Sequence, residues 1–261
     1  MSTAPSIQLL GQSGVRFRTP AGSLLVDPYL TDSVAETFGE ELRRLVPCPV
    51  TFADLADTRA VLITHAHLDH CDPASVLGIL AHAPDARIVA PLSARTILEG
   101  VGVAAARMET ALESWMPLFG DVRAHAVPAA HPSPDREANG EWVSLGYVIE
   151  VGDRRYYHAG DTSPAAVIVE AVRPLGPTVG FLPVNERNYY RERAGILGNM
   201  SVREAFGFAE ELGIETLVPV HWELFEPNQT YREEIELVLA RVRPTFTIRF
   251  ASQDGTTPPL D

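Results

Sequence analysis

The sequence predicts an α/β fold in which two β-sheets pack together as a sandwich covered by helices. Short β-like runs open the chain and lead into strand–helix units, and the same order of elements returns in the second half. No linker divides the 261 residues convincingly. We therefore expect a single domain over residues 1–261.

The first half begins with three β-like runs that glycine-containing turns separate: Ile7–Leu10, Val15–Arg18 and Leu24–Val26. Residues 31–58 are mixed in character and predict a loop with one short helix. The continuous apolar run Ala60–Ile63 predicts a buried strand. Asp72 and Pro73 are typical of an N-cap and a first helical residue, so we expect a helix from there to about Ala83.

Strand–helix alternation continues over residues 87–107. Three more strands are predicted in the middle of the chain: Asp121–Val127, Val143–Val151 and Arg154–His158. A helix is expected to begin at Pro164, and Thr216–Val220 predicts a later strand. Two capping-box patterns predict the starts of further helices: Ser201 with Glu204, and Thr230 with Glu233.

The charge and composition exclude several classes of protein. Lys and Arg total 21 against 34 Asp and Glu, a net charge of −13, so we expect no nucleic-acid partner and no anionic membrane partner. All the basic residues are arginine, which excludes a Schiff-base lysine and a P-loop lysine. The two cysteines, Cys48 and Cys71, are too few for a disulfide framework.

The sequence also indicates where the protein works. No apolar run approaches the roughly 20 residues of a membrane span. The first residues lack the basic segment and apolar stretch of a secretory signal. We therefore expect a soluble cytoplasmic enzyme or binding protein, and a homo-oligomer is compatible with the sequence.

Three histidines and a carboxylate are gathered on one turn, His65-Ala66-His67-Leu68-Asp69-His70, directly after the predicted strand Ala60–Ile63. Divalent metals of borderline softness prefer this mixture of imidazole nitrogen and carboxylate oxygen. We predict that the turn binds metal. The alternative is a histidine-rich turn without a metal.

Further candidate ligands follow three other predicted strands. His131, Asp161 and His221 each stand in the loop just past a strand. Loops at one edge of a sheet commonly position chemical groups on a rigid scaffold. A lone histidine is more often a structural residue, but the repeated position at strand ends favours one shared site.

These motifs together resemble those of the metallo-β-lactamase superfamily in residue type, order and approximate spacing: His65–His70, His131, Gly160-Asp161-Thr162 and Pro219-Val220-His221. The resemblance covers most of the chain and implies the αββα sandwich of the metallo-β-lactamase fold. Three segments look most like the branch that contains L-ascorbate-6-phosphate lactonase: Val61–His70, Asn185–Met200 and Pro219–Asn228.

The resemblance implies a binuclear site with two divalent metal ions, zinc or manganese. His65, His67 and His131 would bind one metal, Asp69, His70 and His221 the other, and Asp161 would bridge the two. Seven ligands exceed the needs of one tetrahedral metal, which agrees with two cations. The resemblance also implies a hydroxide between the metals as nucleophile, and it gives Asp69, Asp161 and His221 the catalytic roles.

Two more residues are candidates for the surroundings of the metals. Asp27 ends the run Leu24–Val26, and the resemblance implies that it orients a metal-binding histidine; the alternative is a turn carboxylate before Pro28. His158 precedes Asp161 by three residues and is predicted to support the ligands or face the substrate. A strand histidine with a backbone partner is its alternative.

The segment from Asn185 to Arg193 is long for a structureless connection, which favours a functional loop or lid. Guanidinium groups pair bidentately with carboxylate or phosphate. We therefore predict that Arg187 or Arg191 binds an anionic part of the substrate, with Asn185 and Tyr189 as hydrogen-bond partners. The alternative is a solvated loop whose arginines pair with nearby glutamates.

The leading interpretation is a metal-dependent hydrolase of a small anionic ester, a lactone or a phosphorylated sugar acid. A phosphodiesterase of the phospholipase-D-like or nuclease-like kind is the alternative within the superfamily. A di-iron redox protein and a non-catalytic metal-binding protein are alternatives of other classes.

Overall fold

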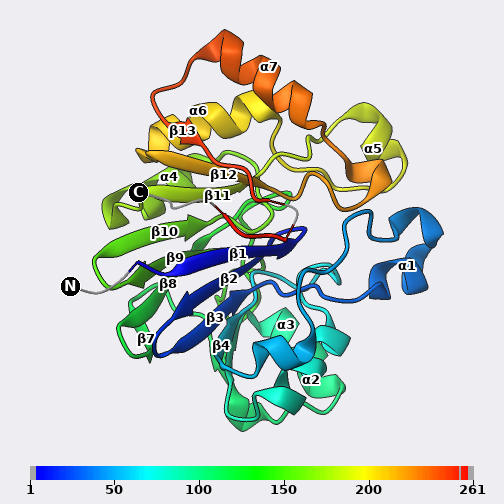
Figure 1. The fold of residues 1–261 in the computed structure, drawn as a ribbon, viewed down its shortest axis with the longest axis vertical. Helices are drawn as coiled ribbons and strands as arrows, with labels where there is room; N and C mark the ends of the chain where they lie inside the picture. Colours follow the sequence, from blue (N-terminus) through cyan, green and yellow to red (C-terminus); the bar gives the residue numbers. More distant parts are fainter. Residues whose placement is uncertain (1–3, 253, 258–261) are drawn as a thin grey trace.

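Two mixed β-sheets pack face to face in the computed structural model, which describes residues 4–252 and 254–257 (Figure 1). In spatial order the first sheet contains β1 (Ser6–Gly11), β2 (Gly14–Thr19), β3 (Gly22–Val26), β4 (Thr58–Leu62), β5 (Arg87–Ala90) and β6 (Met108–Thr110). The second contains β13 (Thr247–Ile248), β12 (Thr216–Val220), β11 (Val179–Pro183), β10 (Arg154–His158), β9 (Leu145–Val151), β8 (Val122–Pro128) and β7 (Met116–Phe119).

Each sheet joins an antiparallel part to a parallel part. Strands β1, β2 and β3 are antiparallel, and β3 to β6 are parallel. The second sheet repeats this arrangement, with β7 to β10 antiparallel and β10 to β13 parallel. The repeated order of hairpins and strand–helix units in the sequence therefore predicted the two halves of the sandwich, and the predicted fold class is confirmed.

Helices cover the outer face of each sheet, as Figure 1 shows. Helices α2 (Pro73–His82) and α3 (Leu92–Gly100) pack their apolar residues on the first sheet. Helices α4 (Ala166–Val172), α6 (Val202–Leu212) and α7 (Arg232–Val242) cover the second. Two short helices, α1 (Ser33–Phe38) and α5 (Tyr189–Arg193), lie together on the right of Figure 1, away from these layers.

Five short 3₁₀ segments complete the helical elements of the described residues: η1 (Glu40–Leu42), η2 (Phe52–Leu55), η3 (Ala105–Arg107), η4 (Arg173–Leu175) and η5 (Glu226–Asn228). In the part of the chain that the structure describes, no helix combines the length and apolar character needed to cross a bilayer.

Aromatic residues join the inner faces of the two sheets. The ring of Phe17 on β2 meets the rings of Tyr156 and Phe181 edge to face, at centroid distances of 5.2 and 5.8 Å. The buried Tyr147 hydroxyl on β9 donates to the Ile63 carbonyl at 2.8 Å. Because this carbonyl lies just past β4, the second sheet fixes the start of the His65–His70 turn.

Two of the three predicted helix N-caps are confirmed. Asp72 caps α2 by accepting hydrogen bonds from two backbone amides, and Pro73 is its first residue. Ser201 and Glu204 form the reciprocal capping box of α6. The capping box predicted at Thr230 is wrong: α7 follows Tyr231 without a side-chain cap, because the Thr230 hydroxyl donates to the Val184 carbonyl at 2.9 Å.

Smaller differences concern boundaries and the mixed segments. Helix α4 begins at Ala166 and not at Pro164, and β9 begins two residues after Val143. Residues 31–58 carry α1 and two 3₁₀ segments where one short helix was expected. The segment Asn185–Arg193 contains α5, whose first turn Asn188 caps, so it is not structureless.

Candidate metal centre

The predicted ligands meet at one edge of the sandwich. The loop after β4 carries His65, His67, Asp69 and His70, and the loop after β8 carries His131. Asp161 follows β10, and His221 directly follows β12. Four strand ends, from both sheets, thus deliver all seven side chains to one place.

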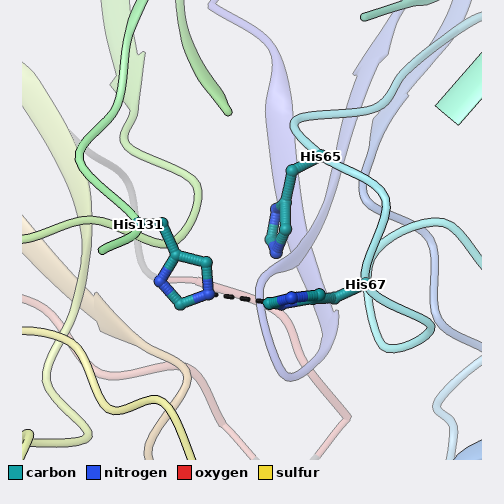
Figure 2. A group of neighbouring side chains, drawn as sticks. All are labelled: His65, His67 and His131. Carbon is teal, nitrogen blue, oxygen red and sulfur yellow. Dashed lines mark hydrogen bonds between the residues drawn. The ribbon is translucent and has the colours of Figure 1, made fainter. Parts of the chain in front are cut away.

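Three of the histidines form the first group. Figure 2 shows the rings of His65, His67 and His131 turned toward one another from two separate loops. The His131 Nε2 and His67 Nδ1 atoms are 3.2 Å apart. One ring nitrogen of each histidine lies within 4.8 Å of the other two, which is close enough for all three to contact one cation.

Asp69, His70 and His221 form the second group. His221 Nε2 is 3.2 Å and His70 Nε2 is 3.6 Å from Asp69 Oδ2. The three ligand atoms again lie within 4.8 Å of one another. This second group draws on both sheets, because His70 follows β4 and His221 follows β12.

Asp161 lies between the two groups. Its Oδ1 is 3.3 Å from His70 Nε2, and its Oδ2 is 3.3 Å from His221 Nε2 and 3.6 Å from His131 Nε2. The preceding Gly160 has φ 60°, and a Cβ there would approach the Leu145 carbonyl oxygen to 2.6 Å. Glycine is therefore required for Asp161 to enter the site from this side.

Several polar atoms of the cluster are buried without a hydrogen-bond partner: His65 Nε2, His70 Nε2 and Asp161 Oδ1. Leaving one such group unpaired costs about 1–3 kcal/mol. These three atoms face a common centre together with the remaining ligand atoms. Imidazole nitrogens and carboxylate oxygens suit zinc, manganese and similar divalent cations, so the residues present fit bound metal.

Electrostatics separate the histidines into two kinds. Burial lowers the pKa of His65 well below its usual value and that of His131 to about 4, so both rings are neutral at pH 7. Burial also opposes charge on His70 and His221, but Asp161 and Asp69 outweigh it. These carboxylates raise the pKa of His70 well above its usual value and that of His221 to about 9. The second group therefore attracts positive charge, which a divalent cation supplies.

Asp27 holds His70 from behind. The His70 Nδ1 atom donates to Asp27 Oδ2 at 2.8 Å, which leaves Nε2 facing the cluster. Thr64 donates its backbone amide and its hydroxyl to the same carboxylate, at 2.8 and 2.6 Å. The structure thus places Asp27 against His70, one of the predicted metal ligands.

A chain of three amides, which the sequence did not reveal, supports His221. Asn228 Nδ2 lies 3.3 Å from His221 Nδ1, and Asn228 Oδ1 accepts from Asn185 Nδ2 at 2.8 Å. Asn185 Oδ1 in turn accepts from Asn199 Nδ2 at 2.9 Å. Asn185 was expected to contact the substrate, but it is buried and reaches the predicted metal ligand His221 only through Asn228.

Gln12 is a second residue that the sequence analysis missed. Its Nε2 lies 2.6 Å from Asp69 Oδ2 and 2.8 Å from His221 Nε2. The backbone carbonyl of Gln12 accepts a hydrogen bond from the backbone amide of His221 at 2.8 Å. Gln12 stands in the turn between β1 and β2, where a polar residue is ordinary, so no local pattern indicates this role.

Strained backbone conformations also mark this site, and they can be seen only in the structure. Four non-glycine residues of the described ranges have positive φ, and three of them lie at this site: Gln12 (54°), Asp27 (44°) and His221 (59°). Such residues cost of order 1–3 kcal/mol each and tend to cluster at functional sites.

His158 has backbone partners. Its Nε2 lies 2.7 Å from the Ser13 carbonyl, and its Nδ1 accepts from the Gly160 amide at 3.2 Å. The ring is fully buried and ties the β1–β2 turn to the loop that carries Asp161. It supports the site through the backbone and does not face the cavity.

The arginines of the segment 185–193 are bound within the protein. Arg191 donates to the carbonyls of Glu186, Pro227 and Gln229 at 2.5, 3.2 and 2.7 Å. Arg187 pairs with Glu204 and donates to the Asn199 carbonyl at 2.9 Å. Tyr189 is 62% exposed and contacts Arg193. The structure does not bring these predicted substrate-binding residues to the cluster.

A cavity of about 700 Å³ opens over the cluster. His67, Asp69, Asp161 and His221 form part of its wall. The rest of the wall comes from Leu68, from residues of α1 and η1, from the turn after α5 (residues 194–197) and from the segment after β12 (residues 225–228). The cavity therefore gives a small molecule access to the ligand atoms.

Comparisons with known proteins support this description. A family model described as "Beta-lactamase superfamily domain" matches residues 23–222. The chain is 30% identical over 209 residues to a UPF0173 metal-dependent hydrolase of Thermoplasma acidophilum, covering 78% of this chain and 77% of that protein.

A UPF0173 metal-dependent hydrolase of Rubrobacter xylanophilus is 27% identical over 243 residues, covering 88% of this chain and 86% of that protein. Among solved structures, a possible metal-dependent hydrolase from Veillonella parvula aligns with a TM-score of 0.78 at 18% identity. That alignment covers 99% of this chain and 100% of the other.

Proposed function

This chain belongs to the beta-lactamase superfamily, and we propose that it hydrolyses a small ester or lactone with two divalent cations bound at the cluster. It is a metal-dependent hydrolase of the metallo-β-lactamase fold. One observation carries the proposal: seven candidate ligands from four strand ends converge beneath an open cavity, and three of their buried atoms have no hydrogen-bond partner.

We assign the ligands as the sequence resemblance implied. His65, His67 and His131 would hold one cation, Asp69, His70 and His221 the other, and Asp161 would contact both. Zinc and manganese both suit this donor set. When bound, such cations lower the pKa of water toward neutrality and polarise a carbonyl oxygen.

The other residues of the site restrain these ligands before any cation arrives. Asp27 fixes the ring of His70, and Asn228 contacts the inner nitrogen of His221. Gln12 holds the Asp69 carboxylate beside His221. Such partners keep ligand rings in the orientation that binding requires, so less conformational freedom is lost on binding.

The carbonyl of a lactone or ester suits the cavity better than a phosphorylated sugar acid or a phosphodiester. Among the described residues, no arginine lines the cavity, and the arginines expected to bind an anion are paired elsewhere. A phosphate group remote from the cations would therefore lack a positive partner.

The test is metal-dependent hydrolysis. The protein is stripped with a chelator, reloaded with Zn²⁺ or Mn²⁺, and assayed on γ-butyrolactone and phenyl acetate. We expect stripping to abolish hydrolysis and reloading to restore it. The His67→Ala variant should stay at background, while His82→Ala, which removes an exposed histidine at the end of α2, should retain activity. Hydrolysis that survives stripping, or no hydrolysis of either compound, would overturn the proposal.

A further inference from the structure

The walls of the cavity differ in character from its polar base. We infer that the substrate is uncharged and carries an apolar group, an acyl chain or a ring, beside the ester or lactone bond. This inference rests on the proposed function and specifies the substrate class of the same site.

Apolar side chains make up most of the wall beyond the cluster. On one part of the wall they come from α1 and η1: Val34, Phe38 and Leu42. On the other part they come from the turn after α5 and the segment after β12: Ile196, Leu197 and Phe225. A group bound against these side chains makes dispersion contacts and few hydrogen bonds. A sugar ring would leave most of its hydroxyl groups without partners here.

The charges of the cavity disfavour an anion. Beyond the cluster, its charged lining residue is Glu41, a carboxylate. The neighbouring arginines are turned away: Arg43 pairs with Asp32 and Glu40, and Arg44 donates to the Tyr29 and Leu10 carbonyls at 2.7 and 2.9 Å. A carboxylate or phosphate on the side group would lose water without gaining a counter-charge.

The solvent exposure of two apolar wall residues also favours an apolar group on the substrate. Phe38 is 63% and Leu197 is 39% exposed, although both are large apolar residues. An apolar group seated in the cavity would cover both side chains, which removes apolar surface from water. Continuity with the cluster would place the reacting bond of such a molecule beside the ligand atoms of Asp69, Asp161 and His221.

Three lactones of one ring type test the inference with the metal-loaded protein. They are γ-butyrolactone, γ-octalactone with its butyl side chain, and the analogue whose side chain of similar length ends in a carboxylate. Each methylene moved out of water is worth about a threefold to fourfold gain in kcat/KM. We expect γ-octalactone to exceed γ-butyrolactone by about a hundredfold, and the carboxylate analogue to lose this gain.

The outcomes separate the inference from the proposed function. Hydrolysis that favours the carboxylate analogue, or that ignores the side chain, overturns the inference but leaves the proposed function intact. Absence of hydrolysis of all three lactones and of phenyl acetate overturns the proposed function. In that case, calorimetric binding of octanamide and of the monoamide of octanedioic acid still decides the inference. We expect octanamide to bind at least tenfold more tightly, and equal or tighter binding of the acid would contradict us.

A charge placed on the wall provides a second test. Leu197→Arg should lower kcat/KM for γ-octalactone and raise it for the carboxylate analogue, because the guanidinium group would pair with the anion. Leu237→Arg is the matched control, since Leu237 is an exposed leucine of α7 that does not line the cavity. Unchanged selectivity of a folded Leu197→Arg protein, or the same change in the control, would remove this wall from the binding site.

Discussion

The metal-ligand cluster and the segment Asn185–Arg193 are both rich in polar and charged side chains, but they differ in how those groups are satisfied. In the cluster, His65 Nε2 and His70 Nε2 are buried without a hydrogen-bond partner. In the segment, Arg191 donates to three backbone carbonyls, and Arg187 pairs with a glutamate. Both regions therefore contain many charged groups. Of the two, only the cluster has buried polar atoms without a hydrogen-bond partner among the described residues.

This difference indicates which region performs chemistry. A group whose hydrogen bonds are complete within the protein has little left to offer a ligand, while convergent unpaired atoms gain free energy when a cation binds. Arg191 instead joins α5 to the loop around η5, which carries Asn228.

Removing one ligand should abolish metal retention. His67→Ala takes one ring nitrogen from the group with His65 and His131, and these two histidines with the shared Asp161 leave the coordination shell incomplete. Elemental analysis of the purified protein should then find little metal at this site, while Arg187→Ala, from the other region, keeps the wild-type content. Wild-type metal content in His67→Ala would contradict the assignment of metal binding to the cluster.

Asp69→Asn should leave the fold intact but lower kcat by about a hundredfold. The asparagine retains the size of the side chain and an oxygen for Gln12, but it removes a charge that faces His70 and His221. Circular dichroism and steady-state kinetics on the substrate identified above check both parts. An unfolded variant, or one with nearly normal kcat, would contradict this division of roles.

Asn228→Ala should weaken metal binding by about tenfold to a hundredfold, because the ring of His221 loses the side chain that lies against its inner edge and limits its rotation. Competition with a chelator measures the affinity. Asn228→Asp should restore much of it, since its carboxylate can accept the Nδ1 proton of a metal-bound ring. Asn139→Ala, in an exposed turn, is the control. Equal affinity in all four proteins would show that the amide chain serves only packing.

Arg191→Met should affect stability and not selectivity. Losing the donors to three carbonyls should lower the free energy of unfolding by about 1–3 kcal/mol. The ratio of kcat/KM for a charged and a neutral lactone should stay that of the wild type. Denaturant titration and kinetics on both lactones measure this, and a selective loss on the charged lactone would return Arg191 to the binding site.

The elements that sequence predicted well are those fixed by local chemistry. Asp72 with Pro73 and Ser201 with Glu204 cap their helices as expected, because a cap depends on neighbours within one turn. Thr230 fails as a cap because its hydroxyl bonds a carbonyl 46 residues away. Such a tertiary contact has no signature in the local sequence.

The same distinction applies to the site. That the seven candidate ligands meet could be predicted because they follow strands, and strand ends meet at a sheet edge. Gln12 could not, because it reaches His221 across 209 residues from an ordinary hairpin turn. The role of Arg191 could not be predicted either. Its guanidinium group binds the carbonyls of Pro227 and Gln229 in and after η5, which lie 36 and 38 residues away in the sequence.

The central claim is that the cluster binds two divalent cations through a shared Asp161. Calorimetric titration of the stripped protein with Zn²⁺, compared with its Asp161→Asn variant, tests this claim most directly. We predict two ions per chain for the wild type and weakened binding of both ions in the variant, because Asp161 faces both groups of ligands. No saturable binding, or two ions bound with unchanged affinity by Asp161→Asn, would contradict the account.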